Sequence, residues 1–239
     1  MVPDIDGKLH HFTNVGLYDG LFVMQDAETQ TLWNHITGEA LYGPLVGHNL
    51  GPVNNLLQMN VKQALAMDPK MQVAISDRTY FAGGRQMGSA GGPPNGGTRA
   101  NGPDANAEMG GRFIGTLGKE DSRRPRMELG LGVWTSAIHR YYPMARIRER
   151  GGAFIDQLDG RKVLMFINAE TNTPAALFVD ASAAKMQDSE VHLGNGAMVR
   201  DGVLFDRAGK RLAMERPHQV FSRWYGFALT FPGCEVFGQ

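Results

Sequence analysis

The chain has 239 residues, of which 42% are hydrophobic, and it carries 24 basic and 24 acidic side chains. This length fits one large domain or two small ones, and the apolar content is sufficient for a packed core. The charge balance argues against a nucleic-acid-binding protein, which normally shows a basic excess.

The start of the chain is predicted to form antiparallel β-structure. Apolar-rich segments at 8–15 and 16–25 are separated by Asp19-Gly20, a strong signal for a hairpin turn. A second turn is expected at 26–29, and a new strand begins at 30–33.

The pattern changes twice in the middle of the chain. Residues 61–67 have the spacing of a short amphipathic helix that ends before Pro69, and a strand is expected at 73–75. Residues 82–111 then hold ten glycines and three prolines, a composition typical of linkers. Two interpretations stay open for this stretch: a plain loop, or a segment packed against the body of the protein or a partner subunit.

The second half returns to β-structure. Strands and one short helical turn are predicted, in chain order, at 130–134, 138–142, 144–150 (helical), 163–167 and 175–179. The run at 163–167 is the clearest buried strand. The single cysteine, Cys234, excludes an internal disulfide and a multi-cysteine metal site, and we expect it to be a buried small apolar residue.

A similar order of turn, strand, amphipathic segment, proline and strand occurs in both halves. We therefore predict an α+β fold, mostly β, built from two related β-rich units with short helices. The first unit is 1–81, a Gly-rich connecting loop covers 82–118, and the second unit is 119–239. The two units are expected to pack as one compact domain, with ligands at their shared seam.

The densest group of reactive side chains lies at 32–45. His35 is a candidate general base, Glu39 its partner or an acid, Tyr42 a hydrogen-bond donor to developing negative charge, and Trp33 a stacking wall for a substrate. The alternative is a structural corner in which Trp33 is core, His35 bonds to the backbone and Glu39 caps a turn.

A second polar cluster lies at 119–130. Arg123 offers a planar fork to a carboxylate or phosphate, and Asp121 and Glu128 are candidate substrate-binding residues that would hold it in place. The alternative is a structural salt-bridge network. Arg124 and Arg126 nearby give either a local basic patch or, as we favour, a solvated loop.

Cofactor motifs are scarce in this sequence. There is no phosphate-binding loop and no strand-linked G-x-G-x-x-G, so a nucleotide cofactor is not expected, and no G-x-S-x-G nucleophile motif occurs. A divalent metal site stays open through residues distant in sequence. His10 and His11 are adjacent and would point to opposite faces of a strand, which makes them a poor chelating pair.

Partners and compartment are only weakly indicated. No apolar run is long enough to cross a membrane, and the first residues do not resemble a signal peptide. We therefore expect a soluble protein with a small-molecule partner, cytoplasmic as written or exported if a leader has been removed. A homo-oligomer formed through the Gly-rich loop is a further expectation.

The chain resembles an uncharacterised bacterial family catalogued as domain of unknown function 3179. The resemblance is carried by Asp26, Thr29 and the strings at 16–23, 33–40, 43–45, 120–123, 128–133, 141–143, 159–161 and 221–236. It implies no established activity. Many members resemble exported proteins, and some carry a Cys-Pro-x-Cys motif that suggests metal or redox work. The corresponding place here, around 168–171, has no cysteine, so a cysteine-dependent role is not expected.

Two functions follow from these residues. The first is a small-molecule hydrolase, acting on an ester or phosphoester without a nucleotide cofactor. The second is a non-catalytic protein that binds a small molecule or a metal. The hydrolase hypothesis requires that His35, Glu39 and Arg123 line one pocket.

Overall fold

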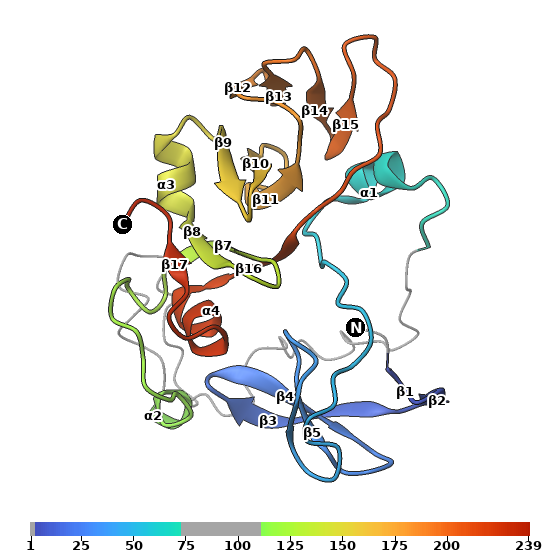
Figure 1. Cartoon of the computed structure of the whole chain (residues 1–239), viewed down its shortest axis with the longest axis vertical. Coiled ribbons are helices and arrows are strands. Elements are labelled where there is room, and N and C mark those ends of the chain that lie inside the picture. Colours follow the sequence, from blue (N-terminus) through green and yellow to red (C-terminus); the bar gives the residue numbers. More distant parts are fainter. Residues whose placement is uncertain (1–2, 73–110) are drawn as a thin grey trace, which may run out of the picture.

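A computed structural model describes residues 3–72 and 111–239 of the chain (Figure 1). Within these ranges the fold is mixed α and β and mostly β, with several separate sheets and short helices, as the sequence predicts. The expected strand at 73–75 and the Gly-rich loop as far as residue 110 lie outside the described residues. No helix in the described ranges combines the length and the apolar character needed to cross a membrane.

The N-terminal part is a four-stranded antiparallel meander in the order β3-β4-β5-β6, preceded by a small hairpin. The predicted turn at Asp19-Gly20 joins β3 to β4, and both residues have positive φ angles of 53° and 70°. The strands are β1 (Asp4–Ile5), β2 (Lys8–Leu9), β3 (Phe12–Tyr18), β4 (Leu21–Asp26), β5 (Leu32–Asn34) and β6 (Ala40–Tyr42).

The second half contains a sheet in the order β16-β7-β8-β17, which two helices flank. Gly132 in β7 lies directly under the ring of Phe227 in α4, where an added Cβ would come within 2.1 Å of the ring. The elements are β7 (Leu129–Trp134), β8 (His139–Pro143), α3 (Met144–Glu149), β16 (His218–Arg223), α4 (Trp224–Thr230) and β17 (Glu235–Val236).

The remaining strands form a three-stranded sheet and a second four-stranded meander. Strand β10 has apolar side chains on both faces: Val163, Met165 and Ile167 belong to one core cluster, whereas Leu164 and Phe166 belong to another. This double burial explains the continuous apolar run in the sequence. The strands are β9 (Ala153–Leu158), β10 (Arg161–Asn168), β11 (Thr173–Phe178), β12 (Ala184–Gln187), β13 (Glu190–Leu193), β14 (Met198–Arg200) and β15 (Val203–Phe205).

The two halves of the chain are in direct contact. Helix α1 (Val61–Met67) lies on the second half, where Gln63 Nε2 donates to Asn168 Oδ1 at 2.9 Å. At the other end, the β3–β4 turn meets the segment after α2 (Gly111–Ile114), where the amide of Gly118 donates to Asp19 Oδ1 at 2.9 Å. The helix predicted for the first unit is therefore packed on the second unit.

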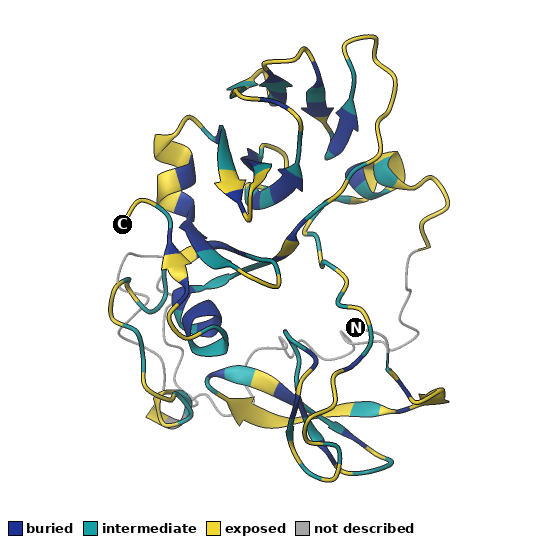
Figure 2. Cartoon of the chain, in the orientation of Figure 1, coloured by how far each residue is buried: buried dark blue, intermediate teal, exposed yellow. Residues whose placement is uncertain are grey.

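Burial is uneven along the chain (Figure 2). The largest buried clusters involve β7–β11, α3 and β13–β15, whereas the N-terminal sheet has a small core of its own, built from Ile5, Trp33, Ala40 and Leu50. Most of β3 is exposed. The division into units and the duplication remain predictions, although each half contains a four-stranded meander.

Candidate functional site

Trp33 lies in the core of the N-terminal sheet. Its side chain is fully buried and packs edge-on against Phe12, with ring centroids 6.1 Å apart. The indole Nε1–H donates to Oδ2 of Asp26 at 2.9 Å. In this position the indole presents no open face to a ligand.

His35 is half-buried and bonded to the backbone. Its Nδ1 lies 2.8 Å from the carbonyl oxygen of Phe22, and because a carbonyl can only accept, this nitrogen carries the proton. Burial lowers the pKa of His35, and the hydrogen bond to Phe22 offsets only part of this effect. The imidazole is therefore neutral at pH 7, with the lone pair on Nε2.

Tyr42 is exposed at the end of β6, the strand that follows, and Glu39 is exposed just before that strand. The amide of Glu39 donates to Thr37 Oγ1 at 3.3 Å. Tyr42 borders an open pocket of about 470 Å³ whose lining is mostly apolar. That lining contains neither His35 nor Glu39, so Tyr42 faces a different space from the proposed base.

Arg123 is held by groups close to the C-terminus. Its guanidinium pairs with Asp121 at 2.6 Å, donates to the carbonyl of Cys234 at 2.9 Å, and lies over the ring of Trp224. The side-chain hydrogen bond between Arg123 and Asp121 is the main cause that lowers the pKa of Asp121 and raises the pKa of Arg123. The pockets beside Arg123 are lined by residues 120–126 and by side chains of the second half.

The other charged residues of this segment also form ion pairs. Arg124 pairs with Glu128, and Arg126 pairs with Glu120 at 2.5 Å. The segment is thus a salt-bridge network, and among the described residues the two pockets that border it are lined by no residue of 32–45. Nearby, Cys234 is buried as predicted, and burial raises the pKa of its thiol to about 11.

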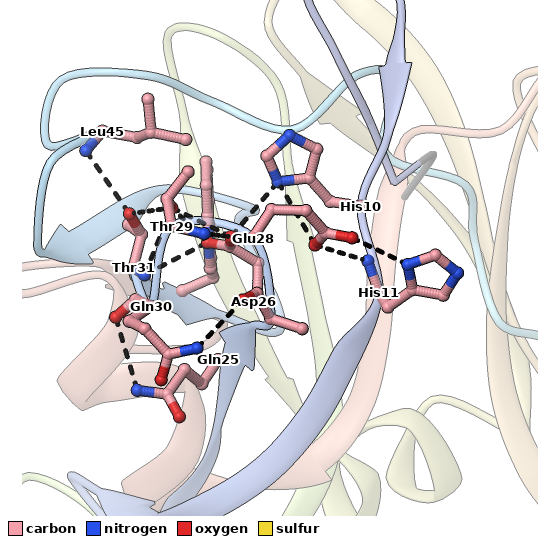
Figure 3. A network of polar contacts seen from close by, with 11 residues as sticks. His10, His11, Gln25, Asp26, Glu28, Thr29, Gln30, Thr31 and Leu45 are labelled. Carbon is pink, nitrogen blue, oxygen red and sulfur yellow. Dashed lines mark hydrogen bonds and ion pairs between the residues drawn. The ribbon is translucent and has the colours of Figure 1, made fainter.

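The densest titratable cluster of the first sheet is one that the sequence did not indicate (Figure 3). His10, Asp26 and Glu28 each offer a ligand atom within 4.8 Å of the others. Nδ1 of His10 lies 3.2 Å from Asp26 Oδ1 and 3.8 Å from Glu28 Oε2. His10 and Asp26 are buried, and Glu28 is only partly exposed.

Asp26 ends β4 and organises the turn that follows. Its carboxylate accepts from the amides of Thr29 and Thr31, from the Thr29 hydroxyl and from the Trp33 indole. Burial alone would raise the pKa of this carboxyl, but the hydrogen bonds from Trp33, Thr29 and His10 outweigh it and lower the pKa to about 2. The carboxylate is therefore charged inside the sheet.

Glu28 is fixed from the opposite side by His11. Its Oε1 lies 2.7 Å from Nδ1 of His11, and its Oε2 accepts a hydrogen bond from the His11 amide at 3.0 Å. The ring hydrogen bond is the main cause that lowers the pKa of Glu28 to about 2. His10 is buried while the His11 side chain is 78% exposed, so the two rings do point apart. Each ring pairs with a carboxylate at the end of β4 or in the turn after it, and not with the other ring.

Strand pairing explains why these residues meet. Phe12 pairs with Asp26 across the β3–β4 hairpin, so the residues just before Phe12 lie beside those just after Asp26. The sequence indicated the hairpin turn at Asp19-Gly20. Working out the strand register from that turn would have placed His10 near Asp26 and Glu28. A bulge between Asn14 and Gly16 shifts that register by one residue.

Comparison with known proteins gives a family but no relative of known activity. Among curated proteins and among solved structures, no significant match is found. The family model described as Protein of unknown function (DUF3179) matches residues 3–221, and the chain therefore belongs to this family.

Proposed function

We propose that this protein binds a divalent metal ion through His10, Asp26 and Glu28, the second of the two functions expected from the sequence. The observation that carries the proposal is the mutual approach of one imidazole nitrogen and two carboxylates within 4.8 Å. The ligands of a tetrahedral zinc ion lie about 3.4 Å from one another, since each is about 2.1 Å from the metal. The distances of 3.2 and 3.8 Å from His10 Nδ1 are close to that spacing.

The surroundings of the cluster support a cation. Two carboxylates with pKa values of about 2 are ionised at pH 7, and the metal would balance their charge. Hydrogen bonds from Thr29, Thr31 and His11 hold the carboxylates in place, as outer groups do around established metal sites. Because a metal ion on Nδ1 needs the lone pair of that nitrogen, the Nδ1 proton that now faces Asp26 would have to move to Nε2 when the metal binds.

Titration calorimetry with Zn²⁺ tests the proposal. Glu28→Gln keeps the size of the side chain and should weaken binding by more than about 100-fold, because it removes a ligand rather than an outer group. His48→Ala is the matched control, because within the described part of the chain the ring of this exposed histidine hydrogen-bonds only to the carbonyl of Leu45, at 3.1 Å. Equal zinc binding by wild type, Glu28→Gln and His48→Ala would overturn the proposal.

A hydrolase acting on esters or phosphoesters, without a nucleotide cofactor, is the second candidate. The state of His35 favours it, because a neutral imidazole with its Nδ1–H fixed by Phe22 leaves Nε2 free to take a proton. Glu39, Tyr42 and Arg123 keep their proposed roles and Asp121 and Glu128 stay substrate contacts, whereas the predicted stacking role of Trp33 is dropped because its side chain is fully buried. This candidate requires a rearrangement that brings Arg123 and Tyr42 to His35.

The hydrolase is tested with a panel of activated esters and phosphoesters. His35→Ala should abolish turnover while leaving the melting temperature nearly unchanged, and His48→Ala should retain full turnover. Loss of stability in His35→Ala with no turnover in the wild type would instead assign His35 a structural role.

A further inference from the structure

Arg216 is a largely buried cation whose partners are backbone carbonyls. Its Nη1 donates to the carbonyl of Ala176 in β11 at 2.9 Å, and its Nη2 donates to the carbonyl of Gly202 at 3.3 Å. Within residues 3–72 and 111–239, no carboxylate lies at ion-pair distance from it. Burial lowers the pKa of Arg216 to about 10, so the guanidinium still carries its charge at pH 7.

This guanidinium lines a small cavity beneath α1. The cavity has a volume of about 30 Å³, which is room for about two water-sized groups. Next to it is a second, larger pocket of about 230 Å³. The two pockets adjoin, since both are lined by Gln63, Phe166, Asn168 and Gly202; we call the smaller one the inner compartment and the larger one the outer compartment.

Asn168 adds a hydrogen-bond donor at the junction of the two compartments. Its Oδ1 accepts from Gln63 Nε2 at 2.9 Å and from the amide of Glu170 at 3.0 Å. A backbone amide can only donate, which fixes the orientation of the Asn168 side-chain amide. The Nδ2 group is therefore directed away from these partners, and no hydrogen bond from it to another described residue is present.

The outer compartment carries the opposite charge. Asp201 pairs with Lys62 at 3.4 Å and Glu190 pairs with Arg200, so these four side chains balance one another. Glu170 and Asp188 also line this pocket and form no ion pair with the described residues. The inner end therefore suits a negative group and the outer end suits a positive one.

We propose that this two-compartment site binds a small zwitterionic amino acid. The carboxylate would lie in the inner compartment against Arg216 and Asn168, and the ammonium group would lie in the outer compartment near Glu170 and Asp188. A guanidinium recognises a carboxylate through charge-assisted hydrogen bonds, and the inner volume admits little more than that group. The site shares no residue with the His10, Asp26 and Glu28 cluster, so each proposal can fail alone.

The experiment is a binding titration followed by NMR, with glycine and γ-aminobutyrate as zwitterions, acetate as the carboxylate alone and ethylamine as the ammonium alone. At least one zwitterion should bind more tightly than acetate or ethylamine. Arg216→Met should weaken its binding by roughly tenfold or more. Arg161→Met is the matched control, because this exposed guanidinium pairs with Glu215, the residue before Arg216, at 2.6 Å.

Two further measurements keep the test decisive. Glu170→Gln should weaken the zwitterion and leave acetate unchanged, since only the ammonium group meets that carboxylate. If Arg216→Met does not fold, the Nε–Hε signal of Arg216 in the wild type should shift on titration with the zwitterion. Absence of that shift, or equal binding by Arg216→Met and wild type, overturns the proposal.

Discussion

At Asp26, a buried carboxylate gathers hydrogen bonds from three side chains and two backbone amides. The same residue ends β4, shapes the next turn, anchors Trp33 and contacts His10. A buried charge is tolerated when its oxygens are this well supplied with donors. The candidate metal site and the core of the first sheet therefore depend on one side chain.

Trp33→Phe isolates one of these donors. The change keeps an aromatic ring in the core and removes the Nε1–H that reaches Asp26. We expect the free energy of unfolding to fall by about 1.5–3 kcal/mol, the usual range for a hydrogen bond to a charged group. Urea denaturation measures the loss.

Trp224→Phe is the control for that measurement. Trp224 is also buried, but its Nε1–H donates to a neutral backbone carbonyl, that of Asp121, at 2.7 Å. The expected loss is smaller, about 1 kcal/mol. A loss for Trp224→Phe as large as that for Trp33→Phe would contradict the special role of the Asp26 carboxylate.

The low pKa of Asp26 predicts acid sensitivity. A carboxyl whose pKa is depressed in the folded state stabilises the fold above its unfolded pKa and loses that contribution as pH falls through its folded pKa. For Asp26 the change from 3.8 to about 2 corresponds to about 2 kcal/mol, lost mainly between about pH 4 and pH 2. The pKa of Glu28 is also lowered in the folded protein, so its protonation adds to the loss of stability in acid.

Denaturant midpoints measured between pH 2 and pH 6 check this expectation. Wild type should lose stability steeply below pH 4, and Asp26→Asn should be less stable at pH 6 but show a flatter decline. Asp206→Asn serves as a control, because that half-buried carboxylate lies in a turn of the second half and, among the described residues, accepts only from the amides of Ala208 and Lys210. An unchanged slope in Asp26→Asn would assign the acid transition to other groups.

At the scale of single elements, local signals fixed several features and left others open. Asp19-Gly20 predicted the β3–β4 turn, the spacing at 61–67 predicted α1, and the apolar run at 163–167 predicted β10, and the structure contains all three. Their causes are local: a turn that tolerates positive φ, an amphipathic period, and burial on two faces. The β12–β15 meander was missed, because its strands are short and lie among polar turns.

The candidate site was less predictable than the strands. His10 meets Glu28 only through the register of a bulged hairpin, and the pairing of Arg123 with the Cys234 carbonyl spans 111 residues. The sequence singled out Arg123 and Asp121 as interacting residues, and they do form an ion pair. It could not place them relative to His35, because that distance is set by how the two halves of the chain pack.

The contact between β7 and α4 gives a prediction at the element scale. Gly132→Ala would place a methyl group 2.1 Å from the Phe227 ring, so the helix or the strand must move. We expect a loss of about 1–3 kcal/mol, the usual cost of overpacking a core. Thermal and urea unfolding measure it.

Gly16→Ala is the control for this change. Gly16 also lies in a strand, β3, but an added Cβ there meets no atom within 4 Å. Its substitution should leave stability nearly unchanged. Phe227→Leu combined with Gly132→Ala should recover part of the loss, whereas equal effects of the two glycine variants would contradict the close contact.

At the scale of the whole molecule, the stretch before α1 ties the first sheet to the second half (Figure 1). Asn55 Nδ2 donates to the carbonyl of Pro217, and Asn55 Oδ1 accepts from the amide of Gln219, both at 2.9 Å. Farther along, Arg211 donates to the carbonyl of Ala66 at 3.0 Å. This stretch therefore crosses the boundary that the sequence suggested between two units.

Asn55→Ala tests how strongly this stretch couples the two halves. The change removes both hydrogen bonds to the segment leading into β16 and leaves the amide of Gln219 without its partner, so we expect a loss of about 1–3 kcal/mol. Hydrogen exchange should accelerate in residues 55–67 and in β16, but not in β3–β6. The neighbouring Asn54→Ala is the control, because the exposed Asn54 side chain donates to no described residue other than Pro52, whose carbonyl it meets at 3.4 Å. If exchange in 55–67 is equally slow in both variants, the packing of α1 alone holds the stretch in place, and Asn55 contributes nothing to the coupling.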